Sequence, residues 1–347
     1  MTSMITNNSA TVALQTLRSI NSNLDVTNNR VSTGKKINSA ADGAAYWSIA
    51  TTLTSDNGAL GAVKDAISLD KASVDTSTAG IKQIASALQT IKNALTSANS
   101  STADRASLQK DIASAITNIS SAATSSVMNG ANWLSVDSSA TGYNASKNLL
   151  SSFSRTAGAV TVGTTALDTS AFTVYDAKTN GTSTGTSTTL DVAVTKVAST
   201  ANTSGGATVT VSTAAGDLKG FMDTKYVIGG TATAATQAIK DFDISALRNT
   251  AADLAKIQAY SKIIDATMQG LQTGSTALGT TSTRLTSQQN FAQTLMDINT
   301  SSVGALVDAN MEEESTKLKA LQTQQQLAVQ SLSIANNSTS NVMTLFR

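Results

Sequence analysis

Both ends of the chain carry runs in which apolar residues recur at alternating steps of three and four. The N-terminal run covers about residues 5–33 and includes Leu17, Ile20, Leu24 and Val31. The C-terminal run keeps this spacing almost to the last residue, at Leu318, Leu321, Ala328, Leu332, Ala335 and Val342. So narrow a stripe is typical of a coiled-coil helix, which needs a partner helix to bury it. The two ends are therefore predicted to pair with each other.

Longer patterns of the same kind lie inside these ends. One starts after Asp42, a candidate helix cap, and continues to Leu95. As a single helix at 1.5 Å per residue it would extend for roughly 80 Å. Further runs occupy about residues 101–122 and 254–296, the first opening with a capping-box-like Ser101 and Asp104. Together these runs predict a bundle of long helices.

The middle of the chain has a different texture. Between about residues 128 and 246 the helical spacing fades and Ser and Thr become abundant. Short alternating segments predict strands at 171–175, 190–194, 207–211 and 226–228, with turns at 180–181 and 205–206. The predicted fold class is therefore mainly α: a long-helix coiled-coil rod formed by the paired N- and C-terminal segments, with a small β-rich outer domain inserted in the middle. A polar insert without fixed structure is the alternative for this domain.

Composition narrows the possible functions. The 347 residues include no Pro, no Cys and no His. The lack of Pro suits unbroken helices, and the lack of Cys and His removes disulfides, the commonest metal ligands and the commonest general base. A net charge of +1 gives no reason to expect nucleic acid or an anionic membrane as a partner. The first nine residues do not resemble a cleavable secretory signal, which taken alone predicts a cytoplasmic protein.

Two acidic clusters are candidates for metal binding or acid–base catalysis. Glu312–Glu314 are followed by Lys317 and Lys319. Consecutive carboxylates point around a helix rather than converging, so a solvated or inter-subunit ion-pair face is favoured over a metal or catalytic site. Asp241 and Asp243 are interpreted as part of a helix start rather than as an acid–base pair. No cofactor, metal or catalytic residue is predicted.

Residues 31–45 read VSTGKKINSAADGAA and contain the pattern S-[ST]-G-x-[RK]-I-N-S-A-x-D-[DG]-A-A. In this pattern the chain resembles bacterial flagellin. Further similarity occurs at 95–99, 128–134, 328–332 and 341–347. The resemblance covers about the first 140 and the last 100 residues, in the right order, and its style is that of the short flagellins of alphaproteobacteria such as rhizobia. The unmatched middle is where flagellins differ most.

This resemblance implies a domain plan and roles for particular residues. Residues 1–42 would form the inner-core N-terminal helix and spoke, 43–142 the outer-core N-terminal helices and hairpin, 143–243 the variable β-rich outer domain, 244–305 the outer-core C-terminal helix, and 306–347 the inner-core C-terminal helix. The self-assembly inner core would comprise Leu17, Ile20, Leu24, Val31, Leu318, Leu321, Ala328, Leu332, Ala335 and Val342. The spoke that joins the two layers would include Ser32, Gly34, Ile37, Asn38 and Asp42.

The resemblance also implies a function. The chain would be a structural subunit, not an enzyme, that polymerises into the helical flagellar filament and so converts motor rotation into thrust. A hook–filament junction protein is the alternative within this class; an adhesin or immune-recognition module is one from another class. A zinc-protease insert is excluded because it needs His-Glu-x-x-His.

Partners and location follow from the same resemblance. The partner would be the chain itself in an open helical homopolymer, with co-assembly of other flagellin types left open. The flagellar export apparatus, cap and hook-junction proteins would be further partners, with no nucleic acid and no membrane. Family members leave the cell unfolded through the type III apparatus with an uncleaved N-terminal signal, so the expected location is the extracellular filament. The polar ends, about residues 1–40 and 310–347, are expected to be disordered in the free subunit.

Two departures from the family pattern stand out. Many flagellins carry an arginine-rich segment bound by the mammalian flagellin-sensing Toll-like receptor, and here Gln89 is followed by Thr90 and Asn93 where that motif has Arg and Glu. A threonine hydroxyl cannot replace the five-donor guanidinium fork, so weak receptor activation is expected. In addition, Tyr46 and Trp47 stand where the family usually has small or aliphatic residues. Trp47 and Trp133 are both interpreted as packing residues.

Overall fold

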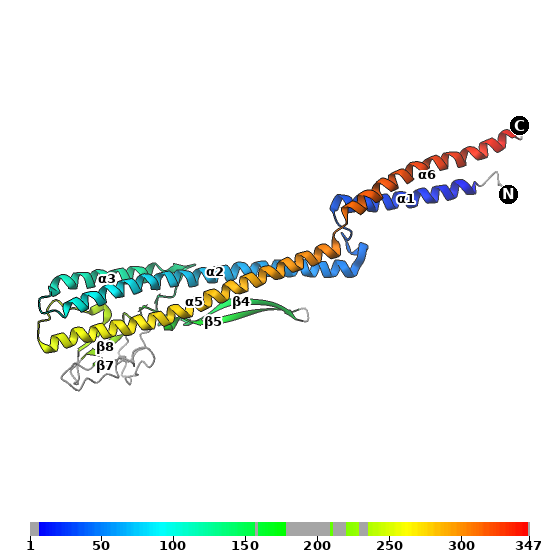
Figure 1. Ribbon diagram of the computed structural model, residues 1–347. Coiled ribbons are helices and arrows are strands. Elements are labelled where there is room, and N and C mark those ends of the chain that lie inside the picture. The colour runs from blue at the N-terminus through cyan, green and yellow to red at the C-terminus, as the bar shows by residue number, and fades with distance from the viewer. Residues whose placement is uncertain (1–6, 157–158, 178–208, 211–219, 229–234, 346–347) are drawn as a thin grey trace. The chain divides into compact units, whose positions relative to one another are not determined.

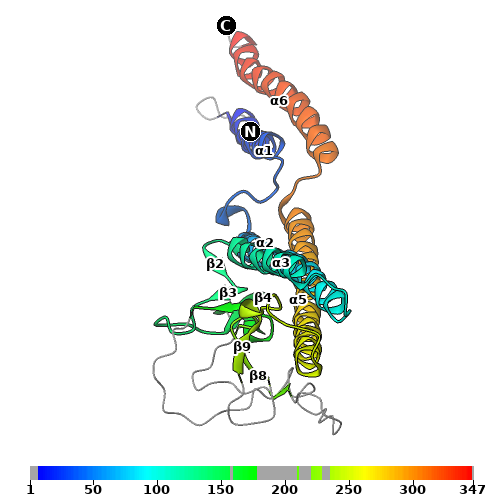
Figure 2. The same ribbon diagram turned by 90° about the vertical axis from the view of Figure 1, so that its left-hand side faces the viewer.

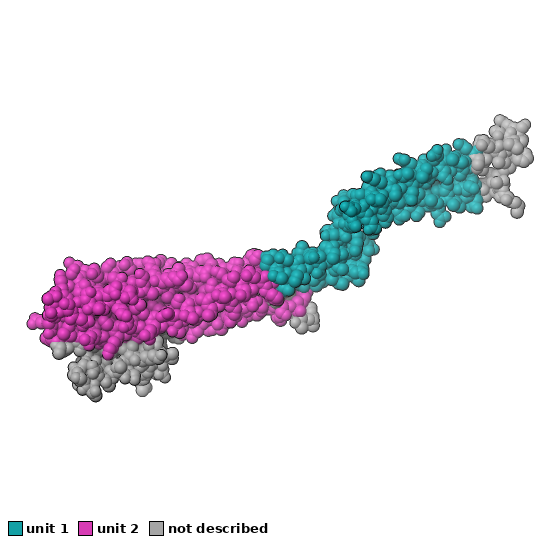
Figure 3. All heavy atoms as spheres, viewed as in Figure 1, with its two compact units in different colours: residues 1–61, 293–347 teal, residues 62–292 magenta. Residues whose placement is uncertain are grey.

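The computed structural model describes residues 7–156, 159–177, 209–210, 220–228 and 235–345, and long helices dominate it (Figure 1). They are α1 (Asn8–Thr33), α2 (Ala40–Ala98), α3 (Arg105–Ser125), α5 (Ala251–Val307) and α6 (Met311–Leu345). The chain separates into two compact units (Figure 3): residues 1–61 with 293–347 form unit 1, and residues 62–292 form unit 2. The mainly α class, with paired terminal helices and a strand-containing middle, is confirmed. The five-part domain plan stays a prediction.

The predicted 3,4 pattern of α2 is the buried face of unit 2. Within unit 2 each apolar position of this pattern is buried, namely Val63, Ile67, Val74, Ile81, Ile84, Leu88, Ile91 and Leu95. The polar interruptions have partners of their own. The Asp70 carboxylate accepts the N–H of Leu150 at 2.7 Å, and the Ser77 hydroxyl donates to the Ser73 carbonyl at 3.0 Å. Burial raises the pKa of Asp70 above its ordinary value, and the hydrogen bond from Leu150 partly offsets this.

Helix α5 runs antiparallel to α2 within unit 2. Polar pairs join the two helices at Lys92 and Asp265 (2.7 Å), Asp75 and Ser282 (3.0 Å), and Ser68 and Gln289 (2.7 Å). The buried row of α5 repeats every seven residues, at Ile257, Ile264, Leu271, Leu278, Leu285 and Ala292. This periodicity is what a long helix needs to keep one face on its neighbour. The predicted register of α5 is therefore confirmed.

Helix α3 lies beside α2 (Figures 1 and 2) and begins at a cap. The Asp104 carboxylate accepts the N–H groups of Ala106 and Ser107, so Asp104 is the N-cap rather than the far member of a box with Ser101. Its predicted apolar face is buried at Ile112, Ala115, Ile119 and Ala122.

A buried arginine fixes the end of this three-helix bundle. The Arg105 guanidinium donates to the carbonyls of Ala98 (3.0 Å) and Leu247 (3.2 Å) and to the Asn249 amide oxygen (2.6 Å). These acceptors come from the end of α2 and from the segment that leads into α5. One side chain thus supplies donors to acceptors on both segments, which a shorter polar residue could not do.

Short strands connect the helices of unit 2. Strands β1 (Val127–Met128) and β2 (Ala131–Asn132) form a hairpin whose turn residues, Asn129 and Gly130, have φ of 51° and 75°. Such left-handed turn pairs favour Asn-Gly. Strand β3 (Ser135–Val136) pairs in parallel with β6 (Tyr175–Asp176). The 3-10 turns cover Thr169–Ala171 and Ile239–Asp241.

The longest strands form the hairpin of β4 (Ser146–Thr156) and β5 (Ala159–Asp168), with a register shift between Leu150 and Ser152. The hydrogen bond that the Leu150 N–H donates to the Asp70 carboxylate therefore holds the hairpin at its bulge. A separate antiparallel sheet contains β7 (Val209–Thr210), β8 (Lys225–Ile228) and β9 (Ala235–Ala238).

The strand predictions had mixed outcomes. The strand predicted at 226–228 is confirmed by β8. Of the strand predicted at 207–211, residues 209–210 form β7, and the other three lie outside the described residues. The strand predicted at 171–175 is wrong, because only Tyr175 belongs to a strand. Residues 172–174 are all buried, Thr173 included, and the N–H groups of Phe172 and Thr173 donate to the Thr169 carbonyl in a turn. The predicted strand at 190–194 and both predicted turns lie outside the described residues. The hairpin β4–β5 was not predicted, since Ser and Thr hide its alternation.

Two glycines of α5 have opposite surroundings. A Cβ at Gly274 would lie 2.5 Å from the Cβ of Phe172 and 3.1 Å from the carbonyl oxygen of Ala171. A Cβ at Gly279 would meet nothing within 4 Å. Gly274 therefore lets the loop at 171–172 approach the helix, whereas Gly279 has no packing reason to be glycine.

These surroundings predict opposite effects for one substitution. Gly279→Ala should stabilise the protein by about 0.5–1 kcal/mol through helix propensity. Gly274→Ala should destabilise it by about 1–3 kcal/mol, because backbone and side chain must move apart. Denaturant unfolding of both variants checks this, and an equal gain in stability for both would contradict the packing at Gly274.

Candidate functional site

Helices α1 and α6 lie side by side and antiparallel in unit 1 (Figure 1). Three hydrogen bonds fix their register. The Asn7 amide donates to the Ala335 carbonyl at 2.9 Å, the Gln325 amide donates to Asn21 Oδ1 at 2.7 Å, and Arg30 Nη1 donates to Glu314 Oε1 at 3.0 Å. The chain's two ends are therefore each other's partner, as the 3,4 spacing predicts.

The inward faces of α1 and α6, which together form the seam of the helix pair, follow the predicted spacing without a break. The less exposed positions on α1 are Ala10, Ala13, Leu17, Ile20, Leu24, Thr27 and Val31. On α6 they are Glu314, Leu318, Leu321, Gln325, Ala328, Leu332 and Ala335. The side chain of Val342 lies outside the described residues. Apart from Thr27, Glu314 and Leu321, these side chains are only half-buried, because each helix has one partner within the chain.

The expectation of disordered ends differs from the structure. Residues 8–33 and 311–345 are helical, and both helices are capped. Asn7 Oδ1 accepts the N–H of Ala10 at 3.0 Å, and Gly34 ends α1 with φ of 70° while its N–H donates to the Arg30 carbonyl. Caps at both ends of α1 and a continuous seam give the pair a definite structure that polarity alone did not indicate.

The acidic triplet divides between two environments. Asn310 Oδ1 accepts the N–H groups of Glu312 and Glu313, whose side chains are exposed at the helix start. Glu314 is instead 8% exposed and forms the ion pair with Arg30 inside the chain. Its Oε2 atom has no hydrogen-bond partner among the described residues. The interpretation as a solvated or inter-subunit face is therefore wrong for Glu314, because the helix turns it into the seam.

The predicted spoke joins α1 to α2 through contacts with the segment before α6. The N–H groups of Lys36 and Ile37 donate to the Val307 carbonyl at 2.7 and 3.3 Å, and the Ala309 N–H donates to the Gly34 carbonyl at 2.9 Å. Ile37 is buried against Ala50 and Val307. Ser32 is exposed on the last turn of α1.

Asp42 closes the start of α2. Its carboxylate accepts the Asn38 N–H at 3.0 Å, the Ser39 N–H at 2.9 Å and the Ser39 hydroxyl at 3.0 Å. The hydrogen bond from Asn38, followed by those from Ser39, lowers the pKa of Asp42 below its ordinary value. Asp42 is thus the third residue of α2, and it reaches back to the N–H of Ser39 as the acidic member of a capping box does, rather than being the cap itself. A kink at Gly43 follows.

The outer faces of the helix pair expose apolar side chains. Each helix has exposed apolar residues two positions after an inward residue. On α1 these are Val12 and Val26, and on α6 they are Leu327 and Ile334, which are 61% and 65% exposed. Leu14 and Val329 are exposed as well. Residues 1–17 and 320–346 contain no charged residue. An apolar surface without charges is costly to leave in water. The charge-free runs are visible in the sequence, although the 3,4 spacing by itself does not indicate them.

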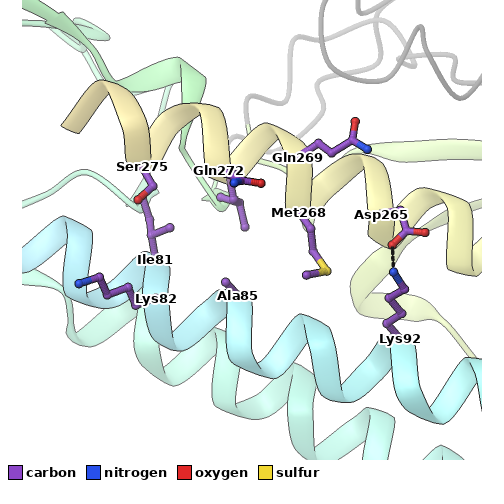
Figure 4. Close-up of a pocket in the computed structure, with 10 residues that line it drawn as sticks. Ile81, Lys82, Ala85, Lys92, Asp265, Met268, Gln269, Gln272 and Ser275 are labelled. Atoms are coloured by element: carbon purple, nitrogen blue, oxygen red, sulfur yellow. Dashed lines mark ion pairs between the residues drawn. The ribbon is translucent and has the colours of Figure 1, made fainter. Parts of the chain in front are cut away.

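Unit 2 has a shallow groove between α2 and α5, shown in Figure 4. Ile81, Ala85 and Met268 line it, and the ion pair of Lys92 with Asp265 crosses it. Both charged side chains are substantially exposed, so this pair contributes little to stability.

Gln89, Thr90 and Asn93 are exposed on α2. The Gln89 amide donates to Asn93 Oδ1 at 3.0 Å, and the Thr90 hydroxyl donates to the Ser86 carbonyl. The segment therefore presents short neutral polar groups rather than cations.

Two searches of the described residues complete the account. No group of three or more His, Cys, Asp or Glu residues there could hold a metal ion. No described helix is long and apolar enough to cross a bilayer.

Comparisons with known proteins agree on one family. The model of the bacterial flagellin N-terminal helical region matches residues 4–139, and that of the C-terminal helical region matches residues 261–346. The chain is 37% identical over 348 residues to flagellin C of Rhizobium meliloti strain 1021, with 100% of both chains covered. Flagellin D of Rhizobium meliloti is 36% identical over 402 residues, and a flagellin of Brucella melitensis biotype 1 is 33% identical over 347 residues, both again with full coverage.

The ion pair within the seam yields a prediction. Arg30→Ala should destabilise the α1–α6 pair by about 1–3 kcal/mol, because it leaves the buried Glu314 carboxylate without its donor. The double variant Arg30→Ala, Glu314→Ala should recover part of that loss. Limited proteolysis within α1 measures the effect, with Glu312→Ala as the exposed control. Additive losses in the double variant would show that the two side chains do not interact.

Proposed function

Since this chain belongs to the bacterial flagellin family and is a structural subunit of the flagellar filament, we propose that the α1–α6 pair is the surface through which its copies join. The observation that carries this proposal is the exposed, charge-free apolar surface outside the seam. The inward residues from Leu17 to Val31 and from Leu318 to Ala335 would hold the pair together. The outer residues would meet neighbouring subunits. The relatives are named flagellins, and nothing favours the hook–filament junction alternative.

The incomplete burial of the inward residues supports the proposal that helices of neighbouring copies pack against the α1–α6 pair. A heptad stripe is fully buried when several helices surround it, and here each helix has one partner within the chain. Neighbouring copies would supply the others. Because a head-to-tail contact that does not close on itself produces an open helical polymer, the same surface repeated along a filament accounts for assembly.

The finer roles follow the family and are proposals for this chain. Gly34, Ile37, Asn38 and Asp42 would act as the spoke, with Ser32 beside them. The subunit would be exported through the flagellar apparatus without loss of an N-terminal signal and would contact the cap and the hook-junction proteins. Co-assembly with other flagellin types is left open. The role would be structural, with no catalytic step.

A charge placed on the outer face should block assembly. Ile334→Glu adds a carboxylate at a position that is 65% exposed in the free subunit, so the subunit should fold normally. Burying that carboxylate between copies is costly, and the critical concentration for seeded polymerisation should rise about tenfold or more. Gln330→Glu adds the same charge at an exposed polar position and should have a smaller effect. Equal, small effects of both substitutions would argue against this face.

We also propose that the segment at Gln89, Thr90 and Asn93 activates the flagellin-sensing Toll-like receptor weakly, because it lacks a guanidinium at position 90. The double substitution Thr90→Arg, Asn93→Glu should raise the response in a reporter-cell assay. Thr117→Arg on α3 adds the same cation elsewhere and should not. A full response to the unmodified subunit would contradict this proposal.

A further inference from the structure

Three asparagines of the chain are followed by a glycine, and the structure places two of them in opposite surroundings. These two are Asn57 and Asn129, and the third, at residue 180, lies outside the described residues. An Asn-Gly sequence has a reactivity of its own, because glycine has no side chain to keep its nitrogen away from the preceding carboxamide. Whether the nitrogen reaches that carboxamide depends on the local structure.

Asn129 and Gly130 form the exposed two-residue turn between β1 and β2. The strands pair residues 127–128 with residues 131–132, so the Gly130 N–H takes no part in the ladder. Within the described part of the chain, no group bonds to the Asn129 carboxamide or accepts the Gly130 N–H. Each strand contains only two residues, and so short a hairpin opens at small cost. The turn can therefore rotate until the Gly130 nitrogen meets the Asn129 carboxamide.

Asn57 is fixed within α2. Its amide donates to the Met296 carbonyl at 3.1 Å and to the Thr300 hydroxyl at 2.9 Å, and its Oδ1 atom is buried. Gly58 follows in the same helix, where the N–H of an interior residue bonds to the carbonyl four positions earlier. The attacking nitrogen and the carboxamide are thus both held in other contacts.

We propose that Asn129 is a site of spontaneous deamidation in the folded protein and that Asn57 is protected from this reaction. The Gly130 nitrogen bonds to Asn129 Cγ, the bond from Cγ to Nδ2 breaks, and Nδ2 leaves as ammonia with the proton of the Gly130 nitrogen. Water then opens the resulting succinimide ring at either of its carbonyls. One opening gives aspartate at residue 129, and the other gives isoaspartate, in which the main chain passes through the former side chain.

The products would alter the connection between α3 and the core of unit 2. Asn132, at the end of the hairpin, donates to the Ala123 carbonyl at 2.7 Å and accepts the N–H groups of Leu134 and Ser135. Isoaspartate adds a methylene to the main chain of the turn, which should weaken the pairing of β1 with β2. Both products also place a negative charge in residues 112–136, which contain no charged residue.

Ageing of the purified full-length subunit tests this proposal. After incubation in warm, mildly alkaline buffer, peptide mapping by mass spectrometry should find deamidation at residue 129 in several-fold excess over residue 57. The rate at residue 129 should rise with pH, because the attacking nitrogen must lose its proton. Incubation in concentrated urea unfolds both sites and should make the two rates similar.

A matched variant links the reaction to its structural effect. Asn129→Gly keeps a residue that suits the left-handed turn and removes the carboxamide, so no product should form at this position. Amide exchange at Val127 and Met128 should become faster on ageing of the unmodified protein and should not change in this variant. Equal rates at residues 57 and 129 in the folded protein would contradict the proposal. So would the absence of product at residue 129 after a time in which the unfolded chain has reacted.

Discussion

The degree to which each apolar stripe of this protein is buried depends on the number of helices that pack against it. A row of apolar residues spaced by three and four covers only part of a helix's circumference. One neighbouring helix buries such a row partly, and several neighbouring helices bury it fully. In unit 2, where α2, α3 and α5 pack together, Ile84, Leu88 and Ile91 are fully buried. In unit 1, where α1 and α6 have only each other, residues of the same type and spacing are half-buried. The same 3,4 spacing therefore produces a fully buried core in unit 2 and a partly exposed helix pair in unit 1.

The distribution of charge supports the same distinction. The charged residues of α1 and α6 gather towards the spoke, where Arg30 and Glu314 pair, and the far part of both helices has none. Exposed helices in water normally carry charges on their outer faces. Their absence beside Leu327 and Ile334 fits a surface that is covered in the working state. Two independent observations therefore favour assembly. The inward residues of the helix pair are incompletely buried, and its outer residues are apolar and uncharged.

The sequence predicted the helices and their register well, because periodicity is a local property. It identified Leu24 and Leu321 as residues of the inward faces of α1 and α6. It could not identify partners that are distant in the chain. Asp70 interrupts the pattern because it holds Leu150 of a hairpin that Ser and Thr disguised. Glu314 belongs to an acidic triplet, and only the register of the helix pair places it in the seam beside Arg30. By helix propensity alone Gly274 would only destabilise α5, and its role becomes clear from the structure, where the loop at Phe172 packs directly against it.

The discrepancies between predicted and observed burial carry information of their own. Trp47 was expected to pack and is exposed, and inward residues of the α1–α6 pair such as Leu17 and Leu332 are only half-buried. In a monomeric protein such residues would favour aggregation and would be replaced by polar ones. In a filament subunit the amino-acid pattern has to serve two structures, the free chain and the polymer. Positions where the pattern demands burial and the single chain does not provide it are those where the polymer must provide it.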